Sequence, residues 1–261
     1  MNALLCEHGY GARVQILNNP WLSSAMLRIG QAGTSHTEMM ALLRASYAFL
    51  AQWAFGRFLP VCETEGATRM ADLHGQAGHW RGTALDPDQQ VVVLDVIRGG
   101  IVPAQICFEL LTAVLPIERV RLDHVNMARR SGADGHVSGV DLTGSKIGGS
   151  LEGATLVVPD PMGATGSTLV QALDFLSENH GRPARVLALP LIATPEFLRR
   201  VLPAHDDLHV VAGRVDRGLS PADVLDTPPG THWDRERGLD DHDYIVPGAG
   251  GVGELLNNSW C

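Results

Sequence analysis

The chain has 261 residues, of which 45% are hydrophobic and 19% are charged, and its formal net charge is −9 at pH 7. This length allows one large α/β domain with an arm, or two small domains. The acidic balance argues against a nucleic-acid surface, which needs a basic patch, and no apolar run reaches the length of a membrane span. We therefore expect neither nucleic acid nor a membrane among its partners.

The cysteines and the first residues favour a cytoplasmic location. The cysteines show no paired spacing, so we expect reduced thiols. They are Cys6, Cys62, Cys107 and Cys261. The first residues lack the cationic start and the long apolar run of a secretory signal. Nothing in the sequence therefore suggests export.

The N-terminal part of the chain predicts an arm that ends in a long helix. Residues 1–20 read as irregular, and a short helical pattern follows them. Ser35 and Glu38 have the spacing of a capping box, and apolar residues recur at helical spacing from Met39 onward. The helix should therefore end near Phe58, before a proline. We expect its broad apolar face to pack on the main domain or on a second subunit.

Residues 61–90 are polar and rich in glycine, and they could form a short hairpin. His74 and His79 lie in this segment. Their spacing matches no common metal-ligand pattern, so we expect them to bind no metal.

Five apolar runs predict the strands of one parallel sheet. They cover residues 91–97, 116–125, 155–158, 185–193 and 207–212. A near-continuous apolar run, such as 91–97, is typical of a strand that is buried on both faces. Helical patterns alternate with the runs, which implies right-handed crossovers. The predicted fold class is therefore α/β, a parallel sheet flanked by helices.

The strand at 155–158 leads into a loop that is suited to bind an anion. Asp160 stands where the strand should end, and Gly166 allows a tight turn. Ser167 or Thr168 could cap the helix that follows. Unpaired N–H groups and the macrodipole at a helix start attract anions, so an acid beside them suggests a ligand with hydroxyls and phosphate. An ordinary strand–turn–helix with a capping threonine is the structural alternative.

The strand at 91–97 ends in a second candidate anion site. Arg98, Gly99 and Gly100 follow it directly and precede a helical pattern. A glycine turn before a helix can bring backbone N–H groups to an anion, and here an arginine accompanies them. The motif is short and weak when it is taken alone.

A glycine-rich segment at 131–153 predicts a functional loop or lid, because long irregular loops are uncommon in compact domains. It contains Lys146, the only lysine of the sequence. This side chain could close over a ligand or could be an ordinary surface lysine. Just before the segment, Arg129 and Arg130 could be a solvated pair at a strand end.

Two motifs far apart in the chain resemble the uracil phosphoribosyltransferases, a branch of the type I phosphoribosyltransferases. Residues 160–168, Asp-Pro-Met-Gly-Ala-Thr-Gly-Ser-Thr, closely resemble the loop that binds phosphoribosyl pyrophosphate (PRPP). Residues 244–250, Tyr-Ile-Val-Pro-Gly-Ala-Gly, resemble the segment whose backbone reads the uracil edge. Weaker matches are the Arg98 turn and the spacing of His124 and Arg129. The resemblance spans roughly residues 14 to 256.

The resemblance implies a single phosphoribosyltransferase domain over residues 1–261. Residues 1–60 would be the N-terminal arm and helix, residues 61–213 the PRPP-binding core, and residues 214–261 an acceptor-binding hood with an insertion.

The activity that the resemblance implies is a Mg²⁺-dependent transfer of the 5-phosphoribosyl group from PRPP to a nitrogen acceptor, with release of pyrophosphate. The expected acceptor is uracil, which gives UMP. PRPP and water, rather than protein ligands, would hold most of the Mg²⁺ coordination sphere. The family also suggests a homodimer or a larger homo-oligomer.

The implied catalytic residues are Asp160, Arg98 and Arg129, and Arg130 could replace the last of them. The implied PRPP-binding residues are Arg98, Gly99, Arg129, Asp160, Pro161, Met162, Gly163, Ala164, Thr165, Gly166, Ser167 and Thr168. The implied acceptor-binding residues are Tyr244, Ile245, Gly250 and Gly251. Lys146 is a candidate for the loop that closes over the leaving group.

Departures from the family pattern cluster at the acceptor site. The family has Gly at Asp243, Leu at Ala249 and Asp at Gly251, and a later Asp is Glu254 here. An insertion rich in Pro, Asp, Arg and Trp also precedes Tyr244. Loss of a carboxylate at position 251 removes a hydrogen-bond acceptor and a charge. There are therefore two alternative hypotheses. The protein could be a PRPP-dependent transferase for another acceptor, or a PRPP-sensing protein without turnover.

Overall fold

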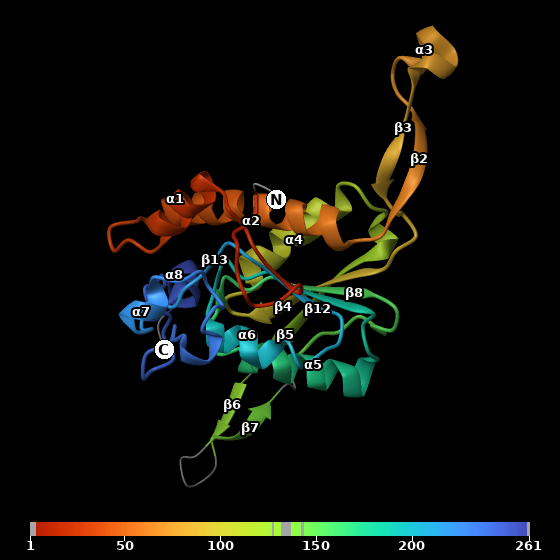
Figure 1. The fold of residues 1–261 in the computed structure, drawn as a ribbon. Helices are drawn as coiled ribbons and strands as arrows, with labels where there is room; N and C mark the ends of the chain where they lie inside the picture. The colour runs from red at the N-terminus through yellow and green to blue at the C-terminus, as the bar shows by residue number, and fades with distance from the viewer. Residues whose placement is uncertain (1–3, 127, 132–136, 142–143, 260–261) are drawn as a thin grey trace.

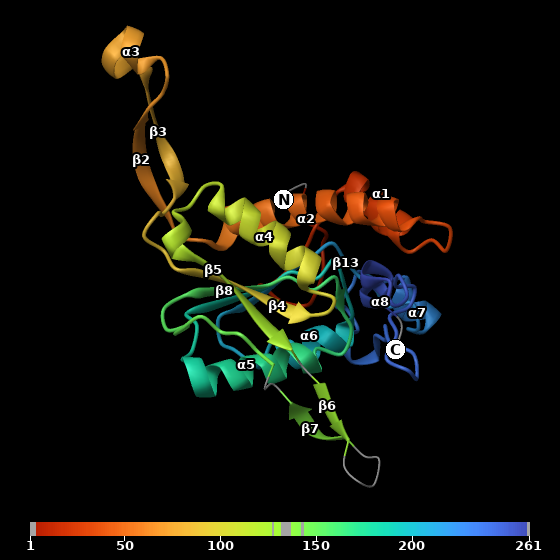
Figure 2. The same cartoon turned by 180° about the vertical axis from the view of Figure 1, so that it is seen from behind.

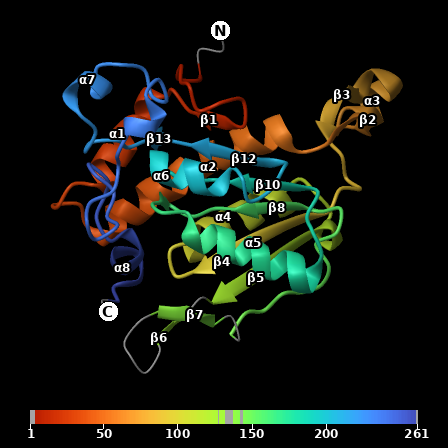
Figure 3. The same cartoon turned by 60° about the horizontal axis from the view of Figure 1, so that its bottom comes forward.

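The centre of the molecule is a mostly buried parallel sheet. A computed structural model describes residues 4–126, 128–131, 137–141 and 144–259. Within these residues the sheet has six strands in the order β1-β12-β10-β8-β4-β5, all paired in parallel (Figures 1 and 3). They are β1 (Val14–Ile16), β4 (Val91–Ile97), β5 (Val120–Asn126), β8 (Thr155–Val158), β10 (Arg185–Ala188) and β12 (Leu208–Ala212). The predicted α/β class is confirmed.

Helices cover both faces of this sheet. One face carries α1 (Pro20–Ile29), α2 (His36–Phe58) and α4 (Ile101–Thr112), and the other carries α5 (Ser167–His180) and α6 (Pro195–Val201) (Figures 1 and 2). In β4, Val91 and Val93 join the core beneath α2 and α4, whereas Val92, Leu94 and Val96 join the core beneath α5 and α6. The apolar run of β4 is therefore buried on both faces, as predicted.

The long N-terminal helix, α2, follows the sequence prediction closely. Ser35 and Glu38 form the reciprocal hydrogen bonds of a capping box, and the helix runs from His36 to Phe58. The Tyr47 side chain is fully buried, and its hydroxyl donates to the carbonyl of Leu189 at 3.1 Å. The apolar face of α2 thus packs on the main domain, which was one of the two alternatives.

Three of the predicted boundaries in the sheet are wrong. The run at 116–125 begins with a short helical turn, Ile117–Arg119, and β5 starts only at Val120. Residues 1–20 were expected to be irregular, but Val14–Ile16 forms the edge strand β1 and pairs with β12. Three residues are too few to show a period of two. The run at 185–193 is two strands, β10 and β11, because Pro190 lies between them and proline has no N–H to donate.

A small second sheet continues from the carboxyl ends of the main strands. It pairs β9 (Met162–Gly163), β11 (Ile192–Ala193) and β13 (Arg214–Val215) in parallel. These strands follow β8, β10 and β12 respectively along the chain. The segment just after Asp160 is therefore fixed by backbone hydrogen bonds rather than left as an open loop.

The segment at 61–90 forms the hairpin that was considered. β2 (Val61–Ala67) pairs with β3 (His79–Leu85), and the short helices α3 (Ala71–His74) and η1 (Gly75–Gly78) lie at the tip. The hairpin projects from the body of the molecule (Figures 1 and 2). His79 contacts Glu65 at 3.1 Å, and among the described residues no group of three or more His, Cys, Asp or Glu could hold a metal ion.

The remaining elements are short. They are η2 (Ile117–Arg119), β6 (Ala128–Ser131), β7 (Val137–Asp141), α7 (Ala222–Leu225), η3 (Trp233–Arg235) and α8 (Val252–Asn257). β6 and β7 pair in the segment that was expected to be a loop. Cys6, Cys62 and Cys107 are free thiols, whereas Cys261 lies outside the described residues. No helix in the described ranges is both long and apolar enough to cross a bilayer.

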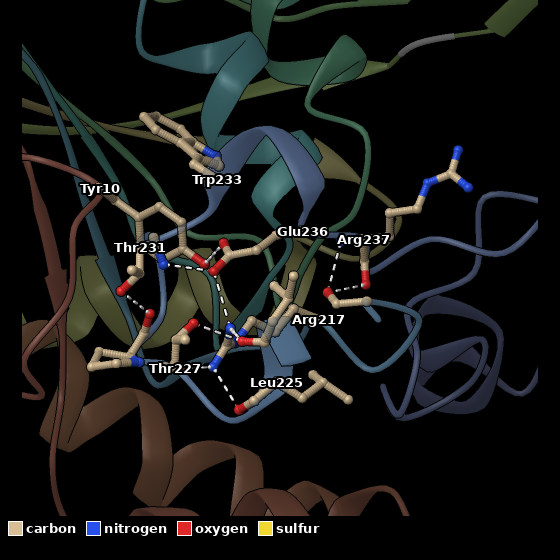
Figure 4. Close-up of polar contacts among 12 residues, drawn as sticks. Tyr10, Arg217, Leu225, Thr227, Thr231, Trp233, Glu236 and Arg237 are labelled. Atoms are coloured by element: carbon tan, nitrogen blue, oxygen red, sulfur yellow. Dashed lines mark hydrogen bonds and ion pairs between the residues drawn. The ribbon is translucent and has the colours of Figure 1, made fainter. Parts of the chain in front are cut away.

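A buried ionic network fixes the insertion that precedes the predicted hood. Glu236 is fully buried and accepts hydrogen bonds from the Tyr10 hydroxyl at 2.5 Å and from Arg217 Nη1 at 3.1 Å (Figure 4). Arg217 also donates to the carbonyls of Val224 and Leu225, at 2.8 and 3.2 Å. The insertion is thus a folded unit that is tied to the N-terminal segment.

Replacing Glu236 by alanine should destabilise the protein strongly, because Arg217 then keeps a largely buried charge without its partner. We expect the free energy of unfolding to fall by about 3 kcal/mol, measured by urea denaturation. Asp223→Ala is the matched control, since it breaks an exposed pair with Arg235 in the same insertion. It should cause a much smaller change. Equal losses in the two variants would contradict this role of the network.

Candidate active site

Two predicted anion-binding loops meet at the carboxyl edge of the sheet. β4 and β8 are neighbours, so the Arg98–Gly100 turn after β4 lies beside the segment that follows β8. A Cβ atom on Gly99 would stand 3.3 Å from Asp160 Oδ1. In open parallel sheets, ligands bind outside the carboxyl ends of the strands. The structure therefore brings Asp160 and Gly99 together as parts of one site.

Asp160 is half-buried, and its carboxylate faces this edge. Its Oδ1 atom accepts a hydrogen bond from the Met162 N–H at 3.1 Å. Burial is the main reason why the pKa of Asp160 is raised to about 6. The Met162 N–H opposes this shift, and the nearby Asp95 carboxylate adds to it. The ionised form is therefore poorly compensated in the free protein, and hydroxyl donors of a ligand would stabilise it.

The loop after Asp160 forms a cradle at the start of α5. Gly166 is the N-cap residue and has a φ of +74°, and a Cβ atom there would stand 2.7 Å from Val201 Cγ1. Only glycine fits both the backbone conformation and the space. Ser167 and Thr168 were predicted to cap the helix, but they lie inside its first turn, and the N-cap residue Gly166 has no side chain. The Ser167 N–H donates to the Thr165 hydroxyl at 3.3 Å, and the next N–H groups of the first turn are oriented for an anion.

A cavity of about 90 Å³ opens between this cradle and Asp160. Residues of the loop line it together with apolar side chains such as Val96, Val158 and Phe197. The lining residues from the loop are Asp160, Met162, Gly163, Ala164, Thr165, Gly166 and Thr168. The Thr165 and Ser167 hydroxyls are 2.8 Å apart at its edge. The arrangement suits a phosphate group beside the helix start.

The C-terminal helix α8 closes over the Arg98 turn. Arg98 Nη1 donates to the Ser259 hydroxyl at 3.0 Å and to its carbonyl at 3.2 Å. Asn257 Nδ2 donates to the Arg98 carbonyl at 3.4 Å. A Cβ atom on Gly253 would stand 3.9 Å from Gly99 Cα. The segment predicted to bind the acceptor thus continues directly onto the segment predicted to bind pyrophosphate.

Hydrogen bonds with Asp216 and Arg214 hold the predicted acceptor segment at Gly248. Asp216 Oδ2 accepts a hydrogen bond from the Gly248 N–H at 2.8 Å. The Arg214 guanidinium donates both to the Asp216 carboxylate and to the Gly248 carbonyl. Ile245 is buried, whereas the Tyr244 side chain is 52% exposed. Gly250 lines a second cavity, of about 690 Å³, between the α1–α2 connection and α8. No described contact joins Tyr244 or Gly250 to Asp160.

Glu254 stands beside the position where the sequence lacks the family's carboxylate. A Cβ atom on Gly251 would lie only 2.5 Å from Glu254 Oε2. Gly251 is the N-cap residue of α8, so position 254 is one helical turn further on and returns to the same face. Position 251 itself lacks a carboxylate, but Glu254 brings one beside it. The helical spacing of positions 251 and 254 was a signal that sequence reasoning missed.

A second missed pair lies behind the Arg98 turn. Asp95, in the apolar strand β4, is 2% exposed, and its Oδ2 atom is 2.8 Å from His124 Nδ1 on β5. Burial raises the pKa of Asp95, and the hydrogen bond and charge of His124 oppose this shift. The sequence did contain a sign of this pair, because Asp95 is an acidic residue inside an otherwise apolar strand.

The predicted basic residues of the next segment are only partly described. Arg129 and Arg130 belong to β6, and their side chains lie outside the described part of the structure. Lys146 is exposed, and its N–H donates to the His124 carbonyl at 2.7 Å. The roles of these three residues stay predictions.

Asparagine at position 160 should stabilise the protein at neutral pH. Because the pKa of Asp160 is raised in the folded state, its stability cost appears as pH rises from about 4 through 6 and persists above. Asp160→Asn should raise the free energy of unfolding by about 1–3 kcal/mol at pH 8. The gain should shrink as pH falls toward 4. Denaturation at several pH values checks this, and a pH-independent gain would contradict it.

Comparisons with known proteins agree with this architecture. The family model described as uracil phosphoribosyltransferase matches residues 16–230. The uracil phosphoribosyltransferase of Desulfitobacterium hafniense is 24% identical over 245 residues, which are 94% of this chain and 98% of that protein. The enzyme named so in Thermococcus gammatolerans is 28% identical over 175 residues, 67% of this chain.

The extent of the matches differs among the relatives. This chain matches 64% of the length of the Thermococcus gammatolerans protein and 34% of its Thermococcus kodakarensis counterpart. Among solved structures, the AQ2163 protein from Aquifex aeolicus shares the fold, with a TM-score of 0.67 and 23% identity over 93% of this chain and 97% of that one. Because the family model covers most of the sequence, the chain belongs to the uracil phosphoribosyltransferase family.

Proposed function

We propose that the protein transfers the 5-phosphoribosyl group of PRPP to a ring nitrogen of uracil, giving UMP and pyrophosphate. The observation that carries the proposal is the contact between the two anion-binding loops, with Gly99 against Asp160. PRPP has a 5′-phosphate, a ribose and a pyrophosphate, in that order. The site offers a phosphate cradle, then a carboxylate for the ribose hydroxyls, then an arginine turn for the pyrophosphate.

Each part of the substrate has a partner in this assignment. The ionised Asp160 carboxylate accepts hydrogen bonds from the ribose hydroxyls. The first turn of α5, with Thr165 and Thr168, holds the 5′-phosphate. Arg98 and Gly99 hold the pyrophosphate, and Arg129 remains our prediction for a further contact. Backbone groups near Gly250 and Gly251 face the acceptor.

In the reaction, the bond between the anomeric carbon and the pyrophosphate oxygen breaks, and its electron pair leaves with pyrophosphate. The acceptor nitrogen forms the new bond from the opposite face, and its proton passes to solvent. Positive charge builds on the sugar meanwhile. The protein contributes by positioning the two substrates and by stabilising the charge on the leaving group.

Mg²⁺, bound to PRPP, would neutralise charge on the leaving pyrophosphate. We therefore assign its coordination to PRPP oxygens and water, and no protein ligand to it. A homodimer or larger assembly and a cytoplasmic location stay our expectations.

A non-uracil nitrogen acceptor is the second candidate, and the insertion favours it. The Gly218 N–H donates to the Val246 carbonyl at 2.9 Å, and the Val246 N–H donates to the Gly238 carbonyl at 2.8 Å. Gly218 and Gly238 lie at the two ends of the insertion. Both backbone groups of Val246 are thus engaged by the insertion, which leaves fewer backbone groups free to read an acceptor edge.

The first test is pyrophosphate release from PRPP and Mg²⁺ with and without uracil, with the nucleotide product identified by mass spectrometry. We expect UMP, and we expect Asp160→Asn to lower the rate roughly 100-fold, since it weakens charge-assisted hydrogen bonds to the ribose. The variant should stay folded. Calorimetric binding of PRPP without UMP formation would reject uracil and favour the second candidate.

The carboxylate beside position 251 gives a separate test of the acceptor site. Glu254→Ala should raise the acceptor KM roughly tenfold and leave the KM for PRPP within about twofold, because one charge-assisted hydrogen bond is lost. The double variant Gly251→Asp with Glu254→Ala should recover most of the loss, since it returns the carboxylate from the neighbouring position. An acceptor KM unchanged in Glu254→Ala would show that this carboxylate does not meet the acceptor.

A further inference from the structure

A buried carboxylate behind the Arg98 turn is incompletely paired. Asp95 Oδ2 contacts His124 Nδ1 at 2.8 Å, but Asp95 Oδ1 has no hydrogen-bond partner within the described residues. A Cβ atom on Gly100 would stand 3.1 Å from this oxygen. Burying a carboxylate costs free energy unless its oxygens are paired. Asp95 therefore lowers the stability of a strand that is otherwise apolar. Its place next to the turn points to a functional reason.

The partner histidine is oriented by this carboxylate and open to solvent. Asp95 and His124 are opposite each other in the register of β4 and β5, and the His124 side chain is 43% exposed. Among the described contacts, none engages Nε2 of His124. A carboxylate that accepts from Nδ1–H leaves Nε2 as an acceptor in the neutral ring and as a donor in the protonated ring. Only the protonated ring can therefore donate to an anion.

The pair lies on the same side of the sheet as the turn. Val91 and Val93 of β4 face the core beneath α2 and α4, so by alternation Asp95 faces that side and lies beneath the start of α4. A Cβ atom on Gly100 would stand 3.1 Å from Asp95 Oδ1, and one on Gly99 would stand 3.3 Å from Asp160 Oδ1, so the turn approaches both carboxylates. His124, Asp95, the Arg98–Gly100 turn and Asp160 thus form one continuous group.

We propose that His124 is a further pyrophosphate-binding residue, which donates from Nε2–H of its protonated ring to a non-bridging pyrophosphate oxygen, and that Asp95 is its positioning residue. The proposal rests on the proposed function for its role in turnover. In that step the anomeric C–O bond breaks with its electron pair on pyrophosphate, and His124 stabilises the added charge without transferring its proton. The pair thereby places a cation behind a turn whose arginine is already engaged by Ser259.

The charged residues on the elements around the pair set its pH dependence. They are Asp95 on β4, Asp160 after β8, Arg98 before α4, and Lys146 in the segment that pairs with the backbone of His124. Histidine changes charge between about pH 5 and 8, so pyrophosphate affinity should fall as pH rises through that range.

The test uses the full chain and two matched variants. His124→Asn keeps a donor that can reach Asp95 but removes Nε2. His209→Asn is the control, because His209 also contacts an aspartate, Asp207, at 2.7 Å, but lies near the amino end of β12. Inorganic pyrophosphate binding is measured by calorimetry between about pH 5 and 8, and kcat and both KM values are measured beside thermal stability.

We expect His124→Asn to weaken pyrophosphate binding at low pH roughly 10- to 100-fold and to flatten its pH dependence relative to the parent protein. The ionisation of pyrophosphate itself is common to both proteins, so their difference isolates the histidine. kcat should fall by a similar factor, with acceptor KM within about twofold. Asp95→Asn, which keeps an oxygen for His124 but not the charge, should also weaken binding at low pH.

Three outcomes would overturn the proposal. One is pyrophosphate affinity in His124→Asn within twofold of the parent at every pH. Another is an equal loss in His209→Asn, which would make both pairs merely structural. The third is absence of pyrophosphate binding by the parent protein. If the parent binds pyrophosphate through His124 but forms no UMP, the proposed acceptor fails and the pyrophosphate site stands.

Discussion

Parallel pairing of β4 with β8 is the constraint on which the site depends. The two strands are far apart in the sequence, and each ends in a loop that is only a weak anion site alone. Pairing places both loops at one edge, where Gly99 and Asp160 approach so closely that a larger residue at position 99 would press on the carboxylate. The second small sheet then fixes the segment after Asp160, so the cavity is formed before any ligand arrives.

Electrostatics explain how an acidic chain offers a site for a highly charged anion. The net charge is −9, and two carboxylates, the buried Asp95 and the half-buried Asp160, lie at the site itself. In the proposed function, local positive potential would come from the start of α5, from Arg98 and from the proposed His124 contact. Such compensation is local, so the bulk charge of the chain says little about which ligand it binds.

The sequence predicted the α/β sheet and the capping box of α2 correctly, because each depends on local patterns. It failed where the answer depends on long-range contacts. β1 exists only through its partner β12, and Pro190 divides a run that composition alone would join. Position 251 seemed to lack a carboxylate, since a sequence does not show that Glu254 folds back beside it. Asp95 was passed over because its partner lies on the neighbouring strand.

The attachment of the N-terminal segment has a consequence for biosynthesis. Among the described strands, β1 pairs with β12, and Tyr10 contacts Glu236, so these partners are separated by most of the chain. During synthesis, residues 14–16 cannot pair with β12 until residues 208–212 have been made, and Tyr10 cannot reach its partner until residue 236 has followed. This edge of the sheet therefore closes only after most of the chain has left the ribosome.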